Sequence, residues 1–144
     1  MAAKRLAVAV LALACLSAPL LGQETYKPLF KGDPAHSRSE AAALGYMRTV
    51  VDAQRAYKKR HQKYATSLQQ LVNNGSFTRR MLKTDRGDYS VAFRAPAKDR
   101  YSVQLTPKTF DAEHRAFYVE ENGTIRVEPD KPATADSPVL HPDR

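Results

Sequence analysis

The apolar residues of this chain repeat with one period before residues 83–88 ("KTDRGD") and with a different period after them. In the first part, apolar residues recur mostly at steps of three and four or their multiples, which is typical of one face of an α-helix. In the second part, apolar and polar residues alternate, which is typical of strands with one buried face. Helix first and strands afterwards predict an α+β fold.

The helical pattern predicts a long helix from Glu40 to about Tyr64, capped by Ser37 or Ser39, and a short helix within residues 67–74. Four strands are predicted at 89–93, 101–106, 115–120 and 124–128, and Asn-Gly between the last two favours a hairpin. We therefore expect a long N-terminal helix and a short helix packed on a four-stranded antiparallel meander. The expected core is Leu44, Met47, Val51, Tyr57, Tyr64, Val91, Phe93, Val103, Leu105, Phe117, Val119 and Ile125.

Residues 1–22 have the layout of a secretory signal peptide, with Lys4 and Arg5 before an uncharged, mostly apolar run that ends at Gly22. Cleavage after Gly22 predicts an exported protein, periplasmic or secreted. Two alternatives remain open: a retained signal anchor, and a lipoprotein in which Cys15 is acylated. Cys15 is the only cysteine, so the chain forms no internal disulfide and depends on its packed core.

The 144 residues are enough for one small domain with appendages. Residues 23–36 contain two prolines and a glycine without any period, so we expect an irregular lead-in. Residues 37–128 hold the predicted helices and strands and form the α+β domain. Residues 129–144 are polar and contain four of the nine prolines, which predicts a disordered tail.

The predicted helix is strongly basic: residues 38–64 contain seven Lys and Arg against two acids. One interpretation is a contact surface for a polyanion, an anionic membrane or a protein partner. The other is the solvated face of a scaffold helix whose tyrosines anchor it on the sheet. Export and the lack of a known nucleic-acid-binding signature argue against nucleic acid. The residues that would make this contact are Arg55, Lys58, Lys59, Arg60 and Lys63.

We find no pattern that predicts catalysis or a cofactor. The four histidines are scattered along the chain, and no HExxH, GxSxG or phosphate-binding Gly loop occurs. Asp85 and Asp88, with Glu120 and Glu121, are the nearest candidates for calcium ligands, but they supply fewer oxygens than calcium requires. Turn chemistry around Gly87 explains Asp85 and Asp88 better. We predict no enzyme activity, no cofactor and no metal site.

Several segments together resemble a known family: "VVDAQRAYKKRHQKYATSLQQL", "GDYSVAF", "YSVQLTP" and "HRAFYVEENGTIR", within residues 38–127. In this order they resemble the globular part of type IV pilins and type II secretion pseudopilins. The family's N-terminus is a short basic leader cut after Gly and followed by a hydrophobic helix, whereas the apolar run here precedes Gly22. The resemblance implies a non-enzymatic domain of the bacterial cell envelope that acts through protein contacts, with a secretion or pilus apparatus as the partner. The alternative is a soluble basic module that binds an anionic partner or membrane surface.

Overall fold

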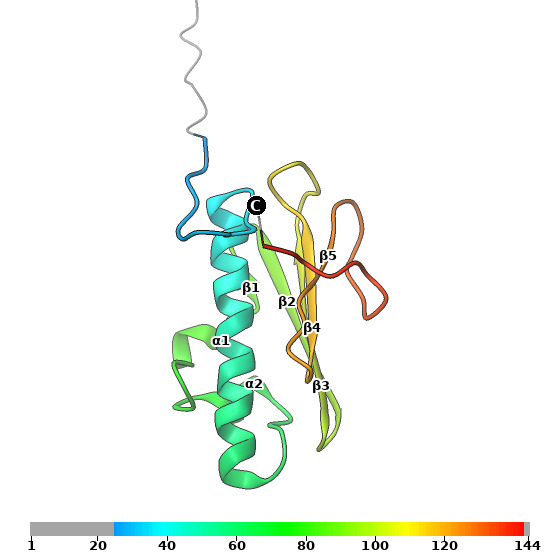
Figure 1. Ribbon diagram of the computed structural model, residues 1–144. Coiled ribbons are helices and arrows are strands. Elements are labelled where there is room, and N and C mark those ends of the chain that lie inside the picture. Colours follow the sequence, from blue (N-terminus) through cyan, green and yellow to red (C-terminus); the bar gives the residue numbers. More distant parts are fainter. Residues whose placement is uncertain (1–24, 143–144) are drawn as a thin grey trace, which may run out of the picture.

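The computed structural model describes residues 25–142, so the predicted signal peptide at 1–22 lies outside the described residues. One long helix lies along one face of an antiparallel sheet (Figure 1). A short helix and a 3-10 helix connect the long helix to the sheet. The elements in chain order are α1 (Arg38–His61), α2 (Leu68–Leu71), η1 (Arg79–Leu82), β1 (Asp85–Arg86), β2 (Tyr89–Ala97), β3 (Arg100–Pro107), β4 (Ala116–Glu120) and β5 (Arg126–Glu128).

Helix α1 begins and ends at residues with clear capping roles. The Ser37 side chain accepts a hydrogen bond from the Glu40 backbone N–H, which confirms the predicted cap at Ser37. At the other end, Gln62 adopts a left-handed conformation with φ 59°, and its N–H donates to the Lys58 carbonyl. The helix therefore stops at His61, three residues before the predicted end at Tyr64.

The prediction of a four-stranded meander behind an N-terminal helix is wrong, and only the broad α+β class holds. The sheet has five strands in the order β1-β2-β3-β4-β5, all antiparallel, and α1 begins only at Arg38, after the lead-in. The missed strand, β1, lies within residues 83–88, where the period of the sequence changes, and pairs Asp85 with Ser90 across Gly87, whose φ is 65°. Two residues are too few for alternation to be visible in a sequence.

Two strand connections also differ from the sequence-based expectation. β2 continues to Ala97 through Pro96, and its pairing with β3 becomes irregular between Arg94 and Ala97 because proline has no N–H to donate. β4 and β5 form the expected hairpin, but its connection runs from 121 to 125, and Gly123 alone has positive φ, 76°. The two-residue Asn-Gly turn is therefore absent.

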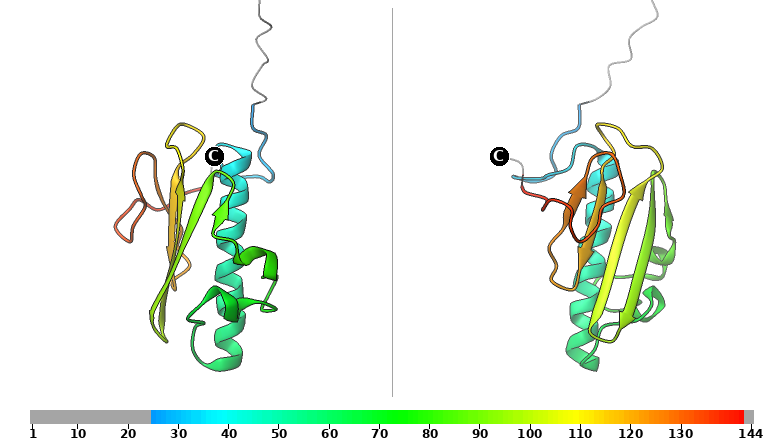
Figure 2. Two further views of the ribbon diagram at one scale, coloured as in Figure 1. Left: turned by 180° about the vertical axis from the view of Figure 1, so that it is seen from behind. Right: turned by 90° about the vertical axis from the view of Figure 1, so that its right-hand side faces the viewer.

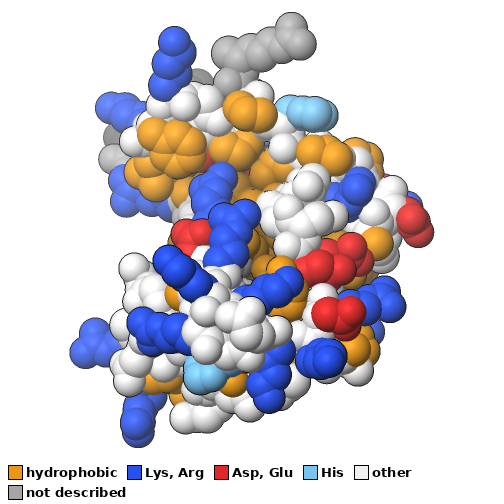
Figure 3. All heavy atoms as spheres, turned by 60° about the horizontal axis from the view of Figure 1, so that its bottom comes forward, with side chains coloured by type: hydrophobic (Ala, Val, Ile, Leu, Met, Phe, Trp, Pro, Cys, Tyr) orange, Lys and Arg blue, Asp and Glu red, His pale blue; other side chains and the backbone are white. Residues whose placement is uncertain are grey.

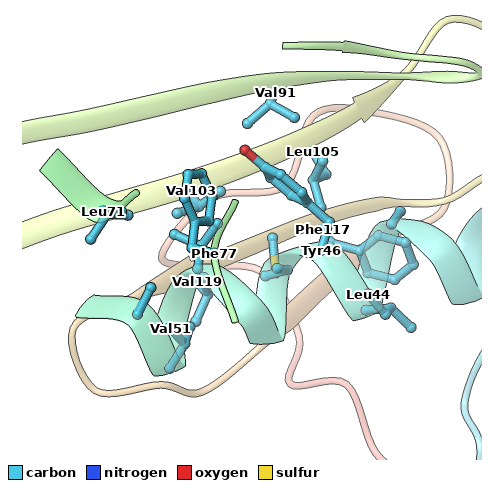
Figure 4. Packing of buried hydrophobic residues seen from close by; sticks show 14 of the residues in the cluster. Leu44, Tyr46, Val51, Leu71, Phe77, Val91, Val103, Leu105, Phe117 and Val119 are labelled. Carbon is cyan, nitrogen blue, oxygen red and sulfur yellow. The ribbon is translucent and has the colours of Figure 1, made fainter. Parts of the chain in front are cut away.

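The core lies between α1 and the inner face of the sheet (Figure 4). Val103 pairs with Val119 and Leu105 with Phe117, and all four side chains are fully buried. Phe93 and Ile125 are only partly buried. The core also includes Tyr46, Val50, Leu71, Phe77, Tyr89 and Tyr101.

Residues 129–142, for which composition predicted disorder, follow a defined path back over the sheet (Figure 2). The Val127 N–H donates to the Pro138 carbonyl, and the Leu140 N–H donates to the Ile125 carbonyl. Ala133 is fully buried, and its carbonyl accepts a hydrogen bond from the Gln104 side chain at 2.7 Å. The first two hydrogen bonds cover the outer edge of β5, which would otherwise present unpaired backbone groups.

Candidate functional site

The five basic residues singled out from the sequence lie at and just beyond the C-terminal half of α1, and all five are exposed. Arg55 differs from the other four because it forms an ion pair with Asp52 at 3.3 Å. Among the described residues, Lys58, Lys59, Arg60 and Lys63 form no ion pair. We call these four residues, together with Lys98, the basic end.

Lys98 joins the basic end through the fold. It lies in the connection between β2 and β3, and its carbonyl accepts a hydrogen bond from the Tyr64 N–H at 2.8 Å. Two further contacts hold the cations in place: the Lys58 ammonium lies 4.3 Å from the centroid of the Tyr64 ring, and Arg60 donates to the Asn74 side chain at 3.4 Å. The basic end therefore combines two segments far apart in the sequence.

The charge around this end has one sign over a long stretch of chain. Residues 53–84 contain eight Lys and Arg and no Asp or Glu. Figure 3 shows Lys and Arg gathered over this end of the molecule, with few acidic side chains among them. Such a field attracts anionic groups and is screened by salt.

Tyr57 of α1 and Tyr64, three residues beyond its end, belong to the core. Tyr57 and Tyr64 are each only 9% exposed. The Tyr64 ring packs edge-on against Tyr101 at 4.9 Å between centroids, and the Tyr57 ring contacts His61. Neither ring is available for base stacking, so the basic end offers charge without an aromatic platform.

The carboxylates near Gly87 each have a partner within the protein. Asp85 binds the Lys108 ammonium at 2.7 Å, and Asp88 accepts hydrogen bonds from Ser39 and from His114 Nε2. The other ring nitrogen of His114 lies 2.7 Å from Asp111. Within residues 25–142, no three His, Cys, Asp or Glu side chains are placed to hold a metal ion.

His114 lies between two carboxylates, and this position determines its protonation. Partial burial alone would lower the pKa of His114, but the hydrogen bonds and negative charges of Asp111 and Asp88 outweigh burial and raise that pKa above its usual range. The pKa of Asp88 is lowered by hydrogen bonds from Ser39 and then from His114. The pKa of Asp111 is lowered by the Glu113 N–H and then by His114. The cluster of Ser39, Asp88, Asp111 and His114 therefore connects α1 to the β1–β2 turn and to the β3–β4 connection.

We expect the contribution of His114 to stability to depend on pH. Because folding raises its pKa, the contribution is fully present below about pH 6.5, the unfolded value, and is lost as pH rises through the folded pKa. His114→Gln should therefore cost on the order of 0.5 kcal/mol at pH 5.5 and less at pH 8.5. Urea unfolding of both proteins at the two pH values measures this. A cost that is equal at both would contradict it.

A buried ion pair lies near the same end of α1. The Glu40 side chain is fully buried, and Arg115 donates to its carboxylate from the backbone N–H and Nε, both at 2.9 Å, and from Nη2 at 2.7 Å. The His36 N–H donates to the second Glu40 oxygen, and Arg115 Nη2 also donates to the Pro34 carbonyl. Both Glu40 oxygens and the Arg115 Nε and Nη2 groups are engaged with each other and with backbone, so the pair serves the scaffold.

A small cavity of about 340 Å³ lies between α1 and the β1–β2 turn, beside Ser39 and Tyr89. Its lining combines Lys83 and Arg86 with Asp85 and Asp88, so it presents no single charge. It also contains no buried side-chain polar atom without a partner. The cavity therefore has no feature that selects a ligand.

Comparison with protein-family models, with curated proteins and with solved structures finds no match to this chain. Among the described helices, none combines the length and the apolar character that crossing a membrane requires. We therefore take the basic end as the candidate functional site, because exposed charge of one sign is concentrated there.

Proposed function

We propose that this chain is a non-enzymatic, exported pilin-like domain that acts through contacts with protein partners in the bacterial cell envelope. The observation that carries the proposal is the basic end, whose five exposed cations form no ion pair within residues 25–142 and project from a packed scaffold. Such cations are free to pair with acidic groups of a partner and to steer its approach. The family resemblance makes a secretion or pilus apparatus the candidate assembly.

The buried polar groups support a scaffold role for the rest of the domain. Gln54 is fully buried, and its side chain both donates to the Ala65 carbonyl and accepts from the Ala65 N–H, at 3.0 and 2.8 Å. This pair of hydrogen bonds fixes the chain just after α1. In the described part of the chain, every buried side-chain nitrogen and oxygen has a hydrogen-bond partner. Buried hydrogen bonds thus hold the chain that leaves α1 beside the basic end, which limits the entropy lost when this end binds a partner.

Photo-crosslinking in the native cell tests the proposal. A photoreactive residue in place of Lys59 should give a discrete adduct with an envelope protein, and one in place of Lys131, on the tail, should not. Both positions are exposed, so a partner protein can reach either probe. Equal adducts from the two positions, or none from Lys59, would contradict a partner surface at the basic end.

The second candidate is a soluble module that binds an anionic polymer, and the acid-free stretch from 53 to 84 favours it. The triple variant Lys58→Glu/Lys59→Glu/Arg60→Glu should then bind heparin more weakly, and the slope of log K against log salt should decrease by about 3. Heparin binding titrated at several salt concentrations measures both.

A matched control separates location from net charge. The triple variant Arg38→Glu/Lys108→Glu/Lys131→Glu removes the same charge at three exposed positions away from the basic end: the start of α1, the end of β3 and the tail after β5. It should keep the wild-type slope. If the two triples weaken heparin binding equally, only net charge matters and the basic end is not a site for polyanions.

A further inference from the structure

Two of the three exposed large hydrophobic residues of the described chain are neighbours in the lead-in. Leu29 is 72% exposed and Phe30 51%, compared with 36% for Val139 on the tail. Single exposed apolar residues need no explanation, but two adjacent ones form a small apolar surface. We call residues 26–33, which contain them, the Asp33 loop.

Hydrogen bonds hold the Asp33 loop in a conformation that leaves these two side chains exposed. The buried Asp33 carboxylate accepts hydrogen bonds from the Tyr26 hydroxyl at 2.5 Å, the Leu29 N–H at 2.9 Å and the Ala35 N–H at 3.1 Å. The Asp33 N–H in turn donates to the Phe30 carbonyl at 3.2 Å. Because one carboxylate gathers both ends of the loop, Leu29 and Phe30 lie at its exposed tip.

The charges around the tip are positive. Lys27 and Lys31 flank the apolar pair and are exposed, and the Arg48 guanidinium lies 5.7 Å from the centroid of the Phe30 ring. The only acid of the loop, Asp33, is buried: burial alone would raise its pKa, but the hydrogen bonds from Tyr26, Leu29 and Ala35 outweigh burial and lower the pKa. An apolar tip flanked by cations is typical of a protein surface that binds an anionic lipid bilayer.

The position of the loop agrees with this pattern. The Asp33 loop lies at the end of the molecule where the described chain begins, and the basic end lies at the far end of α1 (Figures 1 and 2). The two ends are separated by the helix, which is about 36 Å long at 1.5 Å per residue. Leu29 follows the apolar run of residues 6–22 by only seven positions. The Asp33 loop is therefore among the described residues nearest in sequence to that apolar run.

We propose that the Asp33 loop is a membrane-interface contact. Leu29 and Phe30 enter the headgroup region of an anionic phospholipid bilayer, while Lys27, Lys31 and Arg48 bind the lipid phosphates. The domain then stands on the membrane with the basic end directed away from it. This inference rests on the proposed export of the chain but not on the identity of the protein partner.

Vesicle binding tests the contact with the chain from Gln23 to Arg144, which contains every described helix and strand. It should sediment with vesicles of phosphatidylglycerol and phosphatidylcholine, and less with phosphatidylcholine alone. The double variant Leu29→Ser/Phe30→Ser should bind about tenfold more weakly. Val139→Ser, at the third exposed apolar residue, should bind as the wild type does. Circular dichroism confirms that each variant is folded.

Three outcomes would overturn the proposal. Binding that survives Leu29→Ser/Phe30→Ser would show that the loop does not touch lipid. Binding that is lost instead in Lys58→Glu/Lys59→Glu/Arg60→Glu would place the lipid contact at the basic end. A dimer in sedimentation equilibrium that the double serine variant dissociates would identify a second copy of the chain as the occupant. The Lys59 crosslink of the proposed function is unaffected by the first outcome, so the two proposals fail separately.

A second measurement uses the full chain. With Cys15 replaced by serine, an environment-sensitive fluorophore is attached to Lys31→Cys, beside the tip, or to Lys59→Cys, at the basic end. In vesicles that contain phosphatidylglycerol, emission should shift to the blue only for the label at position 31. Equal shifts at both positions, or none at position 31, would contradict an oriented contact.

Discussion

Arg115→Met should be among the most destabilising single substitutions in this protein, with a loss of about 3–5 kcal/mol in the free energy of unfolding. The methionine keeps most of the volume of the arginine stem but removes the guanidinium. The Glu40 carboxylate, fully buried in the first turn of α1, then keeps only the N–H groups of His36 and residue 115 as partners. Removing one member of a buried ion pair leaves the other uncompensated, which is why the cost is high. Urea unfolding monitored by circular dichroism measures it.

The partner variants show whether the cost comes from the unpaired charge. Glu40→Leu should cost less than Arg115→Met, because Arg115 is 15% exposed and can extend its guanidinium to water. The double variant Glu40→Leu/Arg115→Met should be more stable than the sum of the two single losses predicts. Additive losses would mean that the two side chains do not interact, contrary to the distances between them.

This ion pair also shows what sequence reasoning could not reach. Its two residues are 75 positions apart, and nothing local distinguishes Arg115 from the other Lys and Arg residues of the strand region. Glu40 stands three residues after Ser37, the spacing of a capping box, but its carboxylate binds the His36 N–H and Arg115 instead. Apolar periodicity predicts which face of an element is buried, but it gives no information on which polar groups meet after folding.

The candidate site was predictable to the extent that it is local. Lys58, Lys59, Arg60 and Lys63 are consecutive or nearly so on one element, so their common location followed from the sequence. Lys98 joins them only through the hydrogen bond between the Tyr64 N–H and its carbonyl, a long-range contact. The separation of the Asp33 loop from the basic end likewise depends on the straight run of α1 between them.

Phe117→Ala should be comparable in effect, with a loss of about 3–5 kcal/mol. Phe117 is fully buried in β4, pairs with Leu105 and Val127 on either side, and stacks against the Tyr89 ring at 6.2 Å between centroids. Deleting its ring removes apolar contacts from both neighbouring strands and leaves a cavity that the rigid sheet fills poorly. Thermal and urea unfolding of the variant measure the loss.

The neighbouring residue provides the control, because successive side chains of a strand point to opposite faces of the sheet. Tyr118 lies on the outer face, where it pairs with Gln104 and Arg126 and donates to Glu120 at 2.8 Å. Tyr118→Ala should cost about 1 kcal/mol or less. A register shifted by one residue would exchange the faces of every strand position, and Tyr118→Ala would then be the more destabilising of the two. The pair of variants therefore tests the face assignment of the whole sheet, and with it the side on which α1 and its basic end are held.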